Sequence, residues 1–230
     1  MYTDEQQRYW NEMLADNPEM FGDEPSFPAQ EAVKIFKKEV KTEILELGGG
    51  QGRDTLYFAR EGLNVCVVDY ALSGVSIIKQ KIQKVGLSSH VTAICHDVRI
   101  SLPFADKSFD AVYSHMLFCM ALSTTELELL FAEILRVLNP GGLHIYTVRN
   151  TDDTHYKRGI HRGEDMFEVD GFVVHFFSSE KVKRLSQGYA IEGIDKFDEG
   201  ELPRKLFLVK LRKFTATLTS REVRSIDMKK

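Results

Sequence analysis

Along residues 29–148, the spacing of hydrophobic positions switches back and forth between two patterns. Short apolar runs typical of buried strands are followed by stretches in which apolar residues recur every three or four positions, as on one face of a helix. The pattern predicts strands over residues 43–47, 64–68, 90–95, 109–114 and 143–148, and helices over residues 29–39, 53–61, 72–85 and 124–138. Asn139-Pro140-Gly141-Gly142 is expected to stop the last helix. This alternation favours right-handed βαβ crossovers and a parallel sheet covered on both faces.

The two ends of the chain follow other patterns. Residues 1–30 are polar and aromatic with three prolines, which predicts a short helix and then an irregular segment. After a long irregular stretch over residues 149–175, we expect a helix near 179–187 and strands over 190–197 and 205–213. Their connector DEGELPR is too short for a parallel crossover, so the two strands should pair antiparallel. The predicted organisation is a lid segment over 1–30, one domain over 31–214 and a frayed polar tail over 215–230.

Composition and charge narrow the class of protein. A length of 230 residues suits one α/β domain. The net charge of -4 disfavours a nucleic-acid partner, because proteins that bind a nucleic-acid backbone usually have a basic face. No apolar run approaches the length of about 18 residues that crosses a membrane, which predicts a cytoplasmic protein without a membrane partner. Cys66, Cys95 and Cys119 lie in or beside apolar runs without a CxxC pair, so buried thiols are expected and no metal site.

The segment ILELGGGQGRDT joins a buried strand to a helix through a glycine-rich turn, which presents backbone N–H groups to a ligand. Gly48, Gly50 and Gly52 form the pattern GxGxG. Arg53 stands where the dinucleotide-binding fingerprint has its third glycine. Glu46 precedes the turn, where a carboxylate repels a phosphate but suits a ligand that carries an ammonium and a sulfonium. The alternative interpretation is a tight turn without a ligand.

Acidic residues follow the next two predicted strands. Asp69 stands at the tip of the second strand, where its carboxylate can accept hydrogen bonds from both hydroxyls of a ribose. The alternative role of Asp69 is the N-cap of the following helix. Asp97 ends the third strand and can reach an adenine amino group, while Val98 offers a backbone N–H. Three strand tips therefore line one crevice at the carboxyl edge of the sheet.

Taken together, these segments resemble a known family. ELGGGQG, VVDYA, HDV, LPFADKSFDAVYSH and LRVLNPGGLHIYT are similar, in order and spacing, to the motifs of class I S-adenosylmethionine-dependent methyltransferases, over about residues 40–150. The resemblance implies a doubly wound α/β fold with a seven-stranded, mostly parallel sheet and an antiparallel last strand. It also implies bound S-adenosylmethionine and transfer of its methyl group, which leaves S-adenosylhomocysteine.

The resemblance further implies the roles of individual residues. Glu46, Gly48 and Gly50 lie against the methionine moiety, and Asp69 binds the ribose. Tyr70 lies against the adenine, and Asp97 and Val98 form hydrogen bonds with the adenine edge. Ser114 contributes a backbone carbonyl to the adenine amino group. The predicted cofactor site comprises Glu46, Gly48, Gly49, Gly50, Gly52, Arg53, Asp69, Tyr70, Asp97, Val98 and Ser114.

Two departures bear on the methyl acceptor. SHMLF follows the fourth strand in place of the (D/N)PP(Y/F) of enzymes that methylate amino groups of bases or glutamine, which argues against that substrate class. No arrangement of cysteines resembles an arsenite methyltransferase. The later segment EGELPRKLF is more loosely similar to the tellurite-resistance methyltransferases.

The acceptor is expected at the tips of the fourth and fifth strands and in the loops after them. His115 is the candidate catalytic residue, as base or hydrogen-bond donor, with a structural role as the alternative. A base is needed only for an acceptor that starts protonated, and not for a thiolate or an oxyanion of selenium or tellurium. Arg149 either binds an anionic acceptor or pairs with a carboxylate of the following acidic loop. The candidate substrate residues are Tyr9, Trp10, Met116, Arg149, Tyr156, His175 and Arg204, while His155, His161 and His175 lack the spacing of a metal site.

Two aromatic segments have two interpretations each. Tyr9, Trp10 and Phe21 form either a lid that covers the sulfonium by cation–π attraction or the ordinary packing face of an N-terminal helix. FVVHFF, over residues 172–177, is expected to be a strand or extended segment that covers a sheet edge, with an apolar wall of the acceptor pocket as the alternative.

The leading hypothesis is a methyltransferase that acts on a small-molecule acceptor as a monomer or weak homodimer. A second is an S-adenosylmethionine-binding module that acts on, or regulates, a protein partner. A nicotinamide-dependent oxidoreductase is disfavoured by Arg53 and by the terminal antiparallel strands, and nucleic-acid methylation is disfavoured by the acidic charge balance.

Overall fold

The computed structural model describes residues 2–169, 171–200 and 204–215. Its centre is a seven-stranded sheet in the order β3-β2-β1-β4-β5-β10-β9. The strands are β1 (Glu43–Leu47), β2 (Asn64–Asp69), β3 (Val91–Cys95), β4 (Phe109–His115), β5 (Leu138–Arg149), β9 (Tyr189–Glu199) and β10 (Arg204–Lys213). β1 to β5 pair in parallel, and β10 runs antiparallel to both β5 and β9. The predicted sheet with its antiparallel last strand is confirmed.

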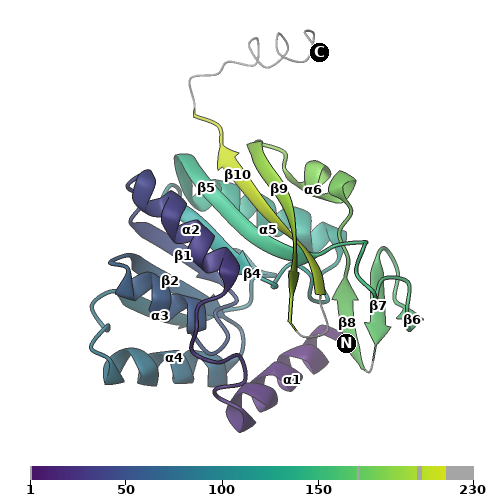
Figure 1. Cartoon of the computed structure of the whole chain (residues 1–230), viewed down its shortest axis with the longest axis horizontal. Helices are drawn as coiled ribbons and strands as arrows, with labels where there is room; N and C mark the ends of the chain where they lie inside the picture. Colours follow the sequence, from purple (N-terminus) through teal and green to yellow (C-terminus); the bar gives the residue numbers. More distant parts are fainter. Residues whose placement is uncertain (1, 170, 201–203, 216–230) are drawn as a thin grey trace.

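Helices cover both faces of this sheet (Figure 1). They are α2 (Phe27–Lys38), α3 (Arg53–Arg60), α4 (Leu72–Lys84), α5 (Thr124–Val137) and α6 (Ser179–Leu185). Successive residues of β1 point to opposite faces, as the pleat of a strand requires. Ile44 packs in one buried cluster with residues of α2, α3 and α4, whereas Leu45 and Leu47 pack in another with residues of α5 and α6. The two clusters together form a doubly wound α/β domain.

The strands and helices predicted over residues 29–148 all form. The bounds of β1 are those predicted, and the largest difference is at β5, which begins at Leu138 and not at residue 143. Leu138 pairs with Phe109 across a shift in register, which draws the Asn-Pro-Gly-Gly segment into the strand. The helix before it ends at Val137, as a proline-glycine stop predicts.

The stretch over residues 149–175 is not irregular throughout, and this prediction was wrong. It contains a three-stranded antiparallel sheet of β6 (Ile160–His161), β7 (Met166–Val169) and β8 (Phe172–His175). Strands this short give little periodic signal, which explains the error. Within the aromatic run at 172–177, residues 172–175 form β8, which pairs with β7 and not with a strand of the central sheet, while Phe177 forms a parallel bridge with Asn150 after β5.

An N-terminal helix, α1 (Tyr2–Asp16), lies across the ends of the central strands, below the sheet in Figure 1. Side chains along α1 hold it there: Gln6 donates to the carbonyl of Val173 on β8, and Gln7 donates to the carbonyl of Tyr70 after β2. Asn11 accepts from the backbone N–H of Ser73 at the start of α4. The predicted helix near the N-terminus is therefore present, and it is tied to the central strands and to the small sheet.

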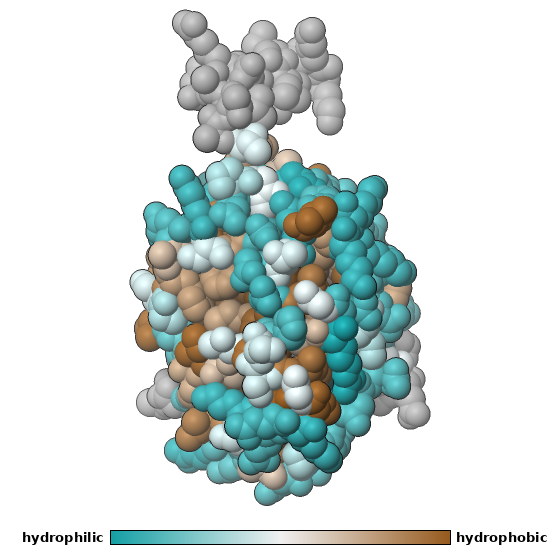
Figure 2. All heavy atoms as spheres, turned by 90° about the vertical axis from the view of Figure 1, so that its left-hand side faces the viewer, coloured by the Kyte–Doolittle hydropathy of each residue, from teal (hydrophilic) through white to brown (hydrophobic). Residues whose placement is uncertain are grey.

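The face of the molecule that Figure 2 shows is the left-hand side of Figure 1, where α2, α3 and α4 lie. Hydrophobic residues gather toward the middle of this face and are bordered by hydrophilic ones. In the described part of the chain, no helix combines the length and the apolar character needed to cross a bilayer. The predicted polar tail lies outside the described residues, except for Thr215.

Candidate active site

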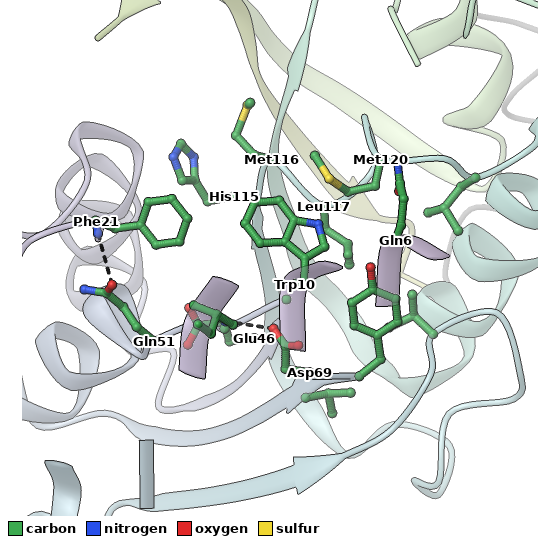
Figure 3. Close-up of a pocket in the computed structure, with 18 of the residues that line it drawn as sticks. Gln6, Trp10, Phe21, Glu46, Gln51, Asp69, His115, Met116, Leu117 and Met120 are labelled. Atoms are coloured by element: carbon green, nitrogen blue, oxygen red, sulfur yellow. Dashed lines mark hydrogen bonds between the residues drawn. The ribbon is translucent and has the colours of Figure 1, made fainter. Parts of the chain in front are cut away.

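A cavity of about 490 Å³ lies at the carboxyl ends of the central strands, where the sequence predicted a crevice. Residues at or near the ends of the first four strands line it, among them Glu46, Gly48, Asp69, Asp97 and His115. In the view of Figure 3, Glu46 and Asp69 lie on one side of the cavity, with His115, Met116 and Met120 on the opposite side and Trp10 between them. Its size is that of a site for a small organic ligand.

The glycine turn is shaped by two different constraints. Gly48, Gly50 and Gly52 have φ of 78°, 54° and 84°, in the left-handed region that favours glycine. Gly49 has ordinary backbone but no room, because a Cβ there would lie 2.2 Å from Cγ2 of Val67. The turn therefore packs close to β2 and leads into α3, whose N-cap is Gly52. Gly52 itself does not line the cavity among the described residues, so its contribution is to the path of the turn.

Asp69 is buried at the end of β2, and backbone N–H groups hold both of its carboxylate oxygens. Gly50 donates to Oδ2 and Ala71 donates to Oδ1, each over 2.8 Å. Burial raises the pKa of Asp69, although these backbone bonds oppose the rise. The N-cap of α4 is Ala71, so Asp69 is not the helix cap that the alternative reading proposed. Each oxygen keeps a lone pair that can accept a hydrogen bond from a ligand hydroxyl.

Glu46 is buried beside the turn, with 3% of its surface exposed, and its Oε2 accepts a hydrogen bond from Thr55 Oγ1 over 2.5 Å. Burial, together with the nearby Asp54 carboxylate, raises the pKa of Glu46 to about 8. Asp54 is held in turn by Ser26 and by the Tyr113 hydroxyl. A positive ligand group in this cavity would favour the ionised form of Glu46.

Binding of an ammonium ligand beside Glu46 is therefore expected to release a proton. A carboxyl group with a pKa of about 8 is about nine-tenths protonated at pH 7, and a cationic ligand lowers that pKa. Affinity should rise with pH below about 8, since the ligand prefers the deprotonated form. Calorimetry with S-adenosylhomocysteine at pH 7, in two buffers of different ionisation enthalpy, should give close to one proton released per site for the native chain. The Glu46→Gln variant should give almost none, and equal heats in both buffers for the native chain would contradict the expectation.

At the end of β3, Asp97 forms a tight ion pair with a residue that the sequence reasoning missed. Arg99 Nε lies 2.9 Å from each carboxylate oxygen of Asp97, and the Arg99 backbone N–H donates to Oδ1. Burial raises the pKa of Asp97, but the Arg99 contacts outweigh it and leave the pKa below its usual value. Val98 and Tyr70 line the same part of the cavity. Nε2 of the neighbouring His96 is buried and has no hydrogen-bond partner among the described residues.

His115, at the end of β4, contacts side chains from two other strands. Its Nδ1 lies 2.8 Å from Oγ1 of Thr147 on β5, and its Nε2 lies 3.3 Å from Oε1 of Glu199 at the end of β9. The Thr147 Oγ1 also accepts the backbone N–H of Met116, whose φ of 65° is unusual for a residue with a side chain. The tip of β4 therefore has a defined geometry in which both ring nitrogens of His115 are engaged.

Two arginines that were candidates for acceptor binding line the cavity, and they differ in burial and in ion pairing. Arg149 is buried and forms an ion pair with Asp153, with Nε 3.0 Å from Oδ2. This is the pairing with the following acidic loop that the sequence left open. Arg204, at the start of β10, is exposed, and no hydrogen bond or ion pair to its side chain is found within the described residues.

Other predicted residues lie elsewhere. Within the described part of the chain, the residues of the predicted site that do not line the cavity are Gly52, Ser114, Tyr9, Tyr156 and His175. Tyr156 donates to Asp165, and the fully buried His175 contacts the carbonyl of Leu122 through Nδ1. His155 and His161 are also outside the cavity lining, and the described residues contain no cluster of His, Cys, Asp or Glu able to hold a metal ion.

The N-terminal segment covers the cavity with both aromatic and polar groups. Trp10 lines it and packs against Phe21 and Phe172, at ring centroid distances of 6.3 Å and 5.7 Å. The Phe21 backbone N–H donates to Gln51 Oε1 in the glycine turn, a bond drawn in Figure 3. Gln6 and Gln51 were not predicted, because an isolated glutamine in a helix or turn carries no sequence signal of its own.

Comparison with known proteins bears on the class. Residues 45–146 match the family model described as a methyltransferase domain. The chain is 29% identical over 161 residues to 24-methylenesterol C-methyltransferase 2 of Oryza sativa subsp. japonica, covering 61% of this chain and 43% of that protein. It is 30% identical over 174 residues to phosphoethanolamine N-methyltransferase 1 of Triticum aestivum, covering 66% and 34%. The chain thus spans less than half the length of either relative.

Solved structures share the fold. The chain aligns with the 1,6-didemethyltoxoflavin-N1-methyltransferase of Burkholderia thailandensis, solved with S-adenosylhomocysteine, at a TM-score of 0.72 and 15% identity, over 93% of this chain and 89% of that one. The sheet order and glycine turn define a Rossmann-like fold with a ligand cavity at the carboxyl edge. Together with the match of residues 45–146 to a methyltransferase domain, this confirms the predicted resemblance to the Rossmann-like S-adenosylmethionine-dependent methyltransferases. The match to a methyltransferase domain supports the predicted methyl donor, S-adenosylmethionine.

The looser likeness to tellurite-resistance methyltransferases has a counterpart among the solved structures. TehB of Haemophilus influenzae aligns at a TM-score of 0.63 and 16% identity, over 80% of this chain and 62% of that one. At this identity the likeness concerns the fold alone, and it gives no information on the acceptor.

Proposed function

We propose that this protein transfers the methyl group of S-adenosylmethionine to a small-molecule acceptor. The observation that carries the proposal is one cavity that is lined both by the glycine turn with the acids of β1 to β3 and by a group of apolar side chains. We call the part of the cavity beside these apolar side chains the acceptor chamber; they are Met116, Leu117, Met120, Leu122, Phe172 and Val174. The names of the relatives, a sterol and a phosphoethanolamine methyltransferase, support a small acceptor.

The residues of the turn and the strand tips fit S-adenosylmethionine in charge and shape. Asp69 keeps hydrogen-bonding capacity for the ribose, and Glu46 is a buried acid suited to the ammonium group. We assign Gly48, Gly49, Gly50 and Arg53 to the methionine side and Tyr70, Asp97 and Val98 to the adenine; Ser114 lies outside the cavity lining and is left out of the assignment. When bound, the cofactor supplies a methyl group on a positively charged sulfur.

The chain itself aligns the reactants and excludes water. Methyl transfer from a sulfonium is an in-line displacement, and correct orientation can supply roughly 7–11 kcal/mol of barrier reduction. The strained backbone at Met116 and its hydrogen bond to Thr147 fix the position of Met116 in the cavity lining. The apolar wall residues favour a dry compartment for the acceptor.

An acceptor screen tests the proposal. The purified protein is incubated with S-adenosylmethionine carrying a labelled methyl group and with a cell extract separated by ultrafiltration into small-molecule and macromolecular fractions. We expect label in the small-molecule fraction, with formation of S-adenosylhomocysteine in equal amount. Label only in the macromolecular fraction would contradict the proposal and would favour a protein partner.

We also propose that α1 and residues up to Phe21 act as a lid, with Trp10 as its main contact. Trp10 lines the cavity, whereas its neighbour Tyr9 is 44% exposed and does not line it within the described chain. Trp10→Ala should weaken S-adenosylmethionine binding by about 5- to 30-fold, the value of a desolvated cation–π contact of roughly 1–2 kcal/mol. Tyr9→Ala is the matched control and should bind like the native chain. Equal affinities for both variants, measured by calorimetry, would remove the lid role of Trp10.

A further inference from the structure

The pair His115–Glu199 places a carboxylate in the cavity that the sequence did not single out. Glu199 ends β9, and the hairpin with β10 brings it beside the tip of β4, where Nε2 of His115 lies 3.3 Å from its Oε1. The side chains of His115 and Glu199 are 14% and 26% exposed, and both line the cavity. No hydrogen bond or ion pair to Glu199 Oε2 is found among the described residues, so this oxygen is available to a ligand.

The hydrogen bonds around His115 indicate which group does the chemistry. Thr147 Oγ1 accepts the Met116 N–H and can still donate its own hydroxyl proton to His115 Nδ1. With Nδ1 as acceptor, the neutral ring carries its proton on Nε2 and donates toward Glu199. His115 then has no lone pair left to take a proton from an acceptor. Its place is that of a positioning residue that orients Glu199.

Glu199 stays ionised in this setting. Burial raises its pKa, but the hydrogen bond from His115, with smaller contributions from Arg53 and Arg204, outweighs burial and brings the pKa below its usual value. The Arg53 side chain also donates to the Phe21 carbonyl, and its Nε lies 3.5 Å from Oδ1 of Asp54. Arg204 is exposed and lines the cavity. The other polar side chains near the acceptor chamber are bonded within the protein: Gln6 to Val173 and Ala121, and Arg149 to Asp153.

We propose that Glu199 makes this a site for an amine acceptor, an apolar molecule whose reacting nitrogen bears N–H groups that donate to Glu199. This inference rests on the proposed function and names its substrate class. In the reaction the bound ammonium first loses one proton to water, the freed nitrogen lone pair attacks the methyl carbon, the C–N bond forms, and the C–S bond breaks with its electron pair left on sulfur. Positive charge moves from sulfur to nitrogen, which keeps its hydrogens, so a fixed carboxylate beside the nitrogen stabilises the transition state. The same carboxylate repels thiolates, phenolates and metalloid oxyanions.

The test measures how the site discriminates charge. The protein is first loaded with S-adenosylhomocysteine and then titrated with 2-phenylethylamine, 2-phenylethanol or 3-phenylpropionate, which share an apolar ring and differ in charge. Because the chain has one tryptophan and Trp10 lines the cavity, its fluorescence reports binding. The amine should bind at least about tenfold tighter than the alcohol, and the acid should bind weakest, as expected for a charge-assisted hydrogen bond.

Three variants separate the role of Glu199 from general damage. Glu199→Gln should weaken amine binding by about 10- to 100-fold and leave alcohol binding and S-adenosylhomocysteine affinity within about threefold. His115→Asn should weaken amine binding less, through the loss of positioning. Asp198→Asn, on the adjacent exposed side chain that pairs with Lys205, is the matched control and should change nothing.

The outcomes are distinct. Preferential binding of the acid, equal loss of amine and alcohol binding in Glu199→Gln, or no binding of any of the three compounds to the loaded protein would overturn the amine assignment. Failure of the native chain to bind S-adenosylhomocysteine in the loading step would instead overturn the proposed function, before any acceptor is added.

Discussion

Replacing Asp69 with alanine should weaken S-adenosylmethionine binding by about 150- to 25,000-fold. The carboxylate is buried, is held by the backbone N–H groups of Gly50 and Ala71, and has one lone pair on each oxygen for the ribose hydroxyls. Two charge-assisted hydrogen bonds are lost, each worth roughly 1.5–3 kcal/mol, and the Gly50 N–H loses its partner. Calorimetric titration of the variant and the native chain measures the effect.

Two controls separate binding from folding in this experiment. The thermal transition of Asp69→Ala without ligand shows whether the domain remains folded. Asp106→Ala removes an acid whose side chain is 72% exposed and pairs with Arg136 outside the cavity lining, and it should leave the affinity unchanged. A folded Asp69→Ala protein whose affinity lies within about fivefold of the native value would contradict the ribose assignment.

The second large effect is expected at Gly49. A Cβ at this position would lie 2.2 Å from Cγ2 of Val67 and 3.3 Å from Cδ1 of Ile78, so Gly49→Ala forces the turn away from β2. Overpacking of this kind costs about 1–3 kcal/mol of unfolding free energy. S-adenosylmethionine binding should be lost with it, because the displaced turn carries the backbone groups that face the cavity. Denaturant unfolding and calorimetry measure the two effects.

Two further variants test whether the contact with Val67 causes these losses: Val67→Ala combined with Gly49→Ala, and Gly62→Ala, at a glycine far from the turn. Val67→Ala removes the methyl group in the way and should restore much of the stability and affinity lost in Gly49→Ala. Gly62→Ala acts through backbone alone, since φ there is 85° and no heavy atom lies within 4 Å of the added Cβ. It should lower stability by about 1–2 kcal/mol and leave ligand affinity unchanged. A Gly49→Ala protein as stable as the native chain would contradict the close packing of the turn.

Much of the fold could be predicted from sequence because each βαβ unit carries its own signal. Buried strands with three or more apolar residues, helices with period-3.6 spacing and glycine or proline stops recur along residues 29–148, and each of these elements forms. The position of Asp69 beside the glycine turn could also be predicted, since the ends of parallel strands meet at one edge of the sheet.

Other features depend on contacts between distant segments. β6, β7 and β8 are too short to show a period, and the path of α1 over the cavity depends on Gln6, Gln7 and Asn11, which carry no local signal. Glu199 was missed because it enters the site only through the register of the β9–β10 hairpin. His115 was predicted as a site residue, but the engagement of both its ring nitrogens depends on Thr147 and Glu199 from other strands.

The central claim is that the cavity binds S-adenosylmethionine, and calorimetric titration of the purified protein with S-adenosylmethionine, S-adenosylhomocysteine and NAD tests it most directly. We predict micromolar binding of the two adenosyl compounds and no binding of NAD, because Glu46 and Arg53 replace the features that hold a pyrophosphate. Binding of NAD without either adenosyl compound would contradict the account and every site assignment that rests on the glycine turn.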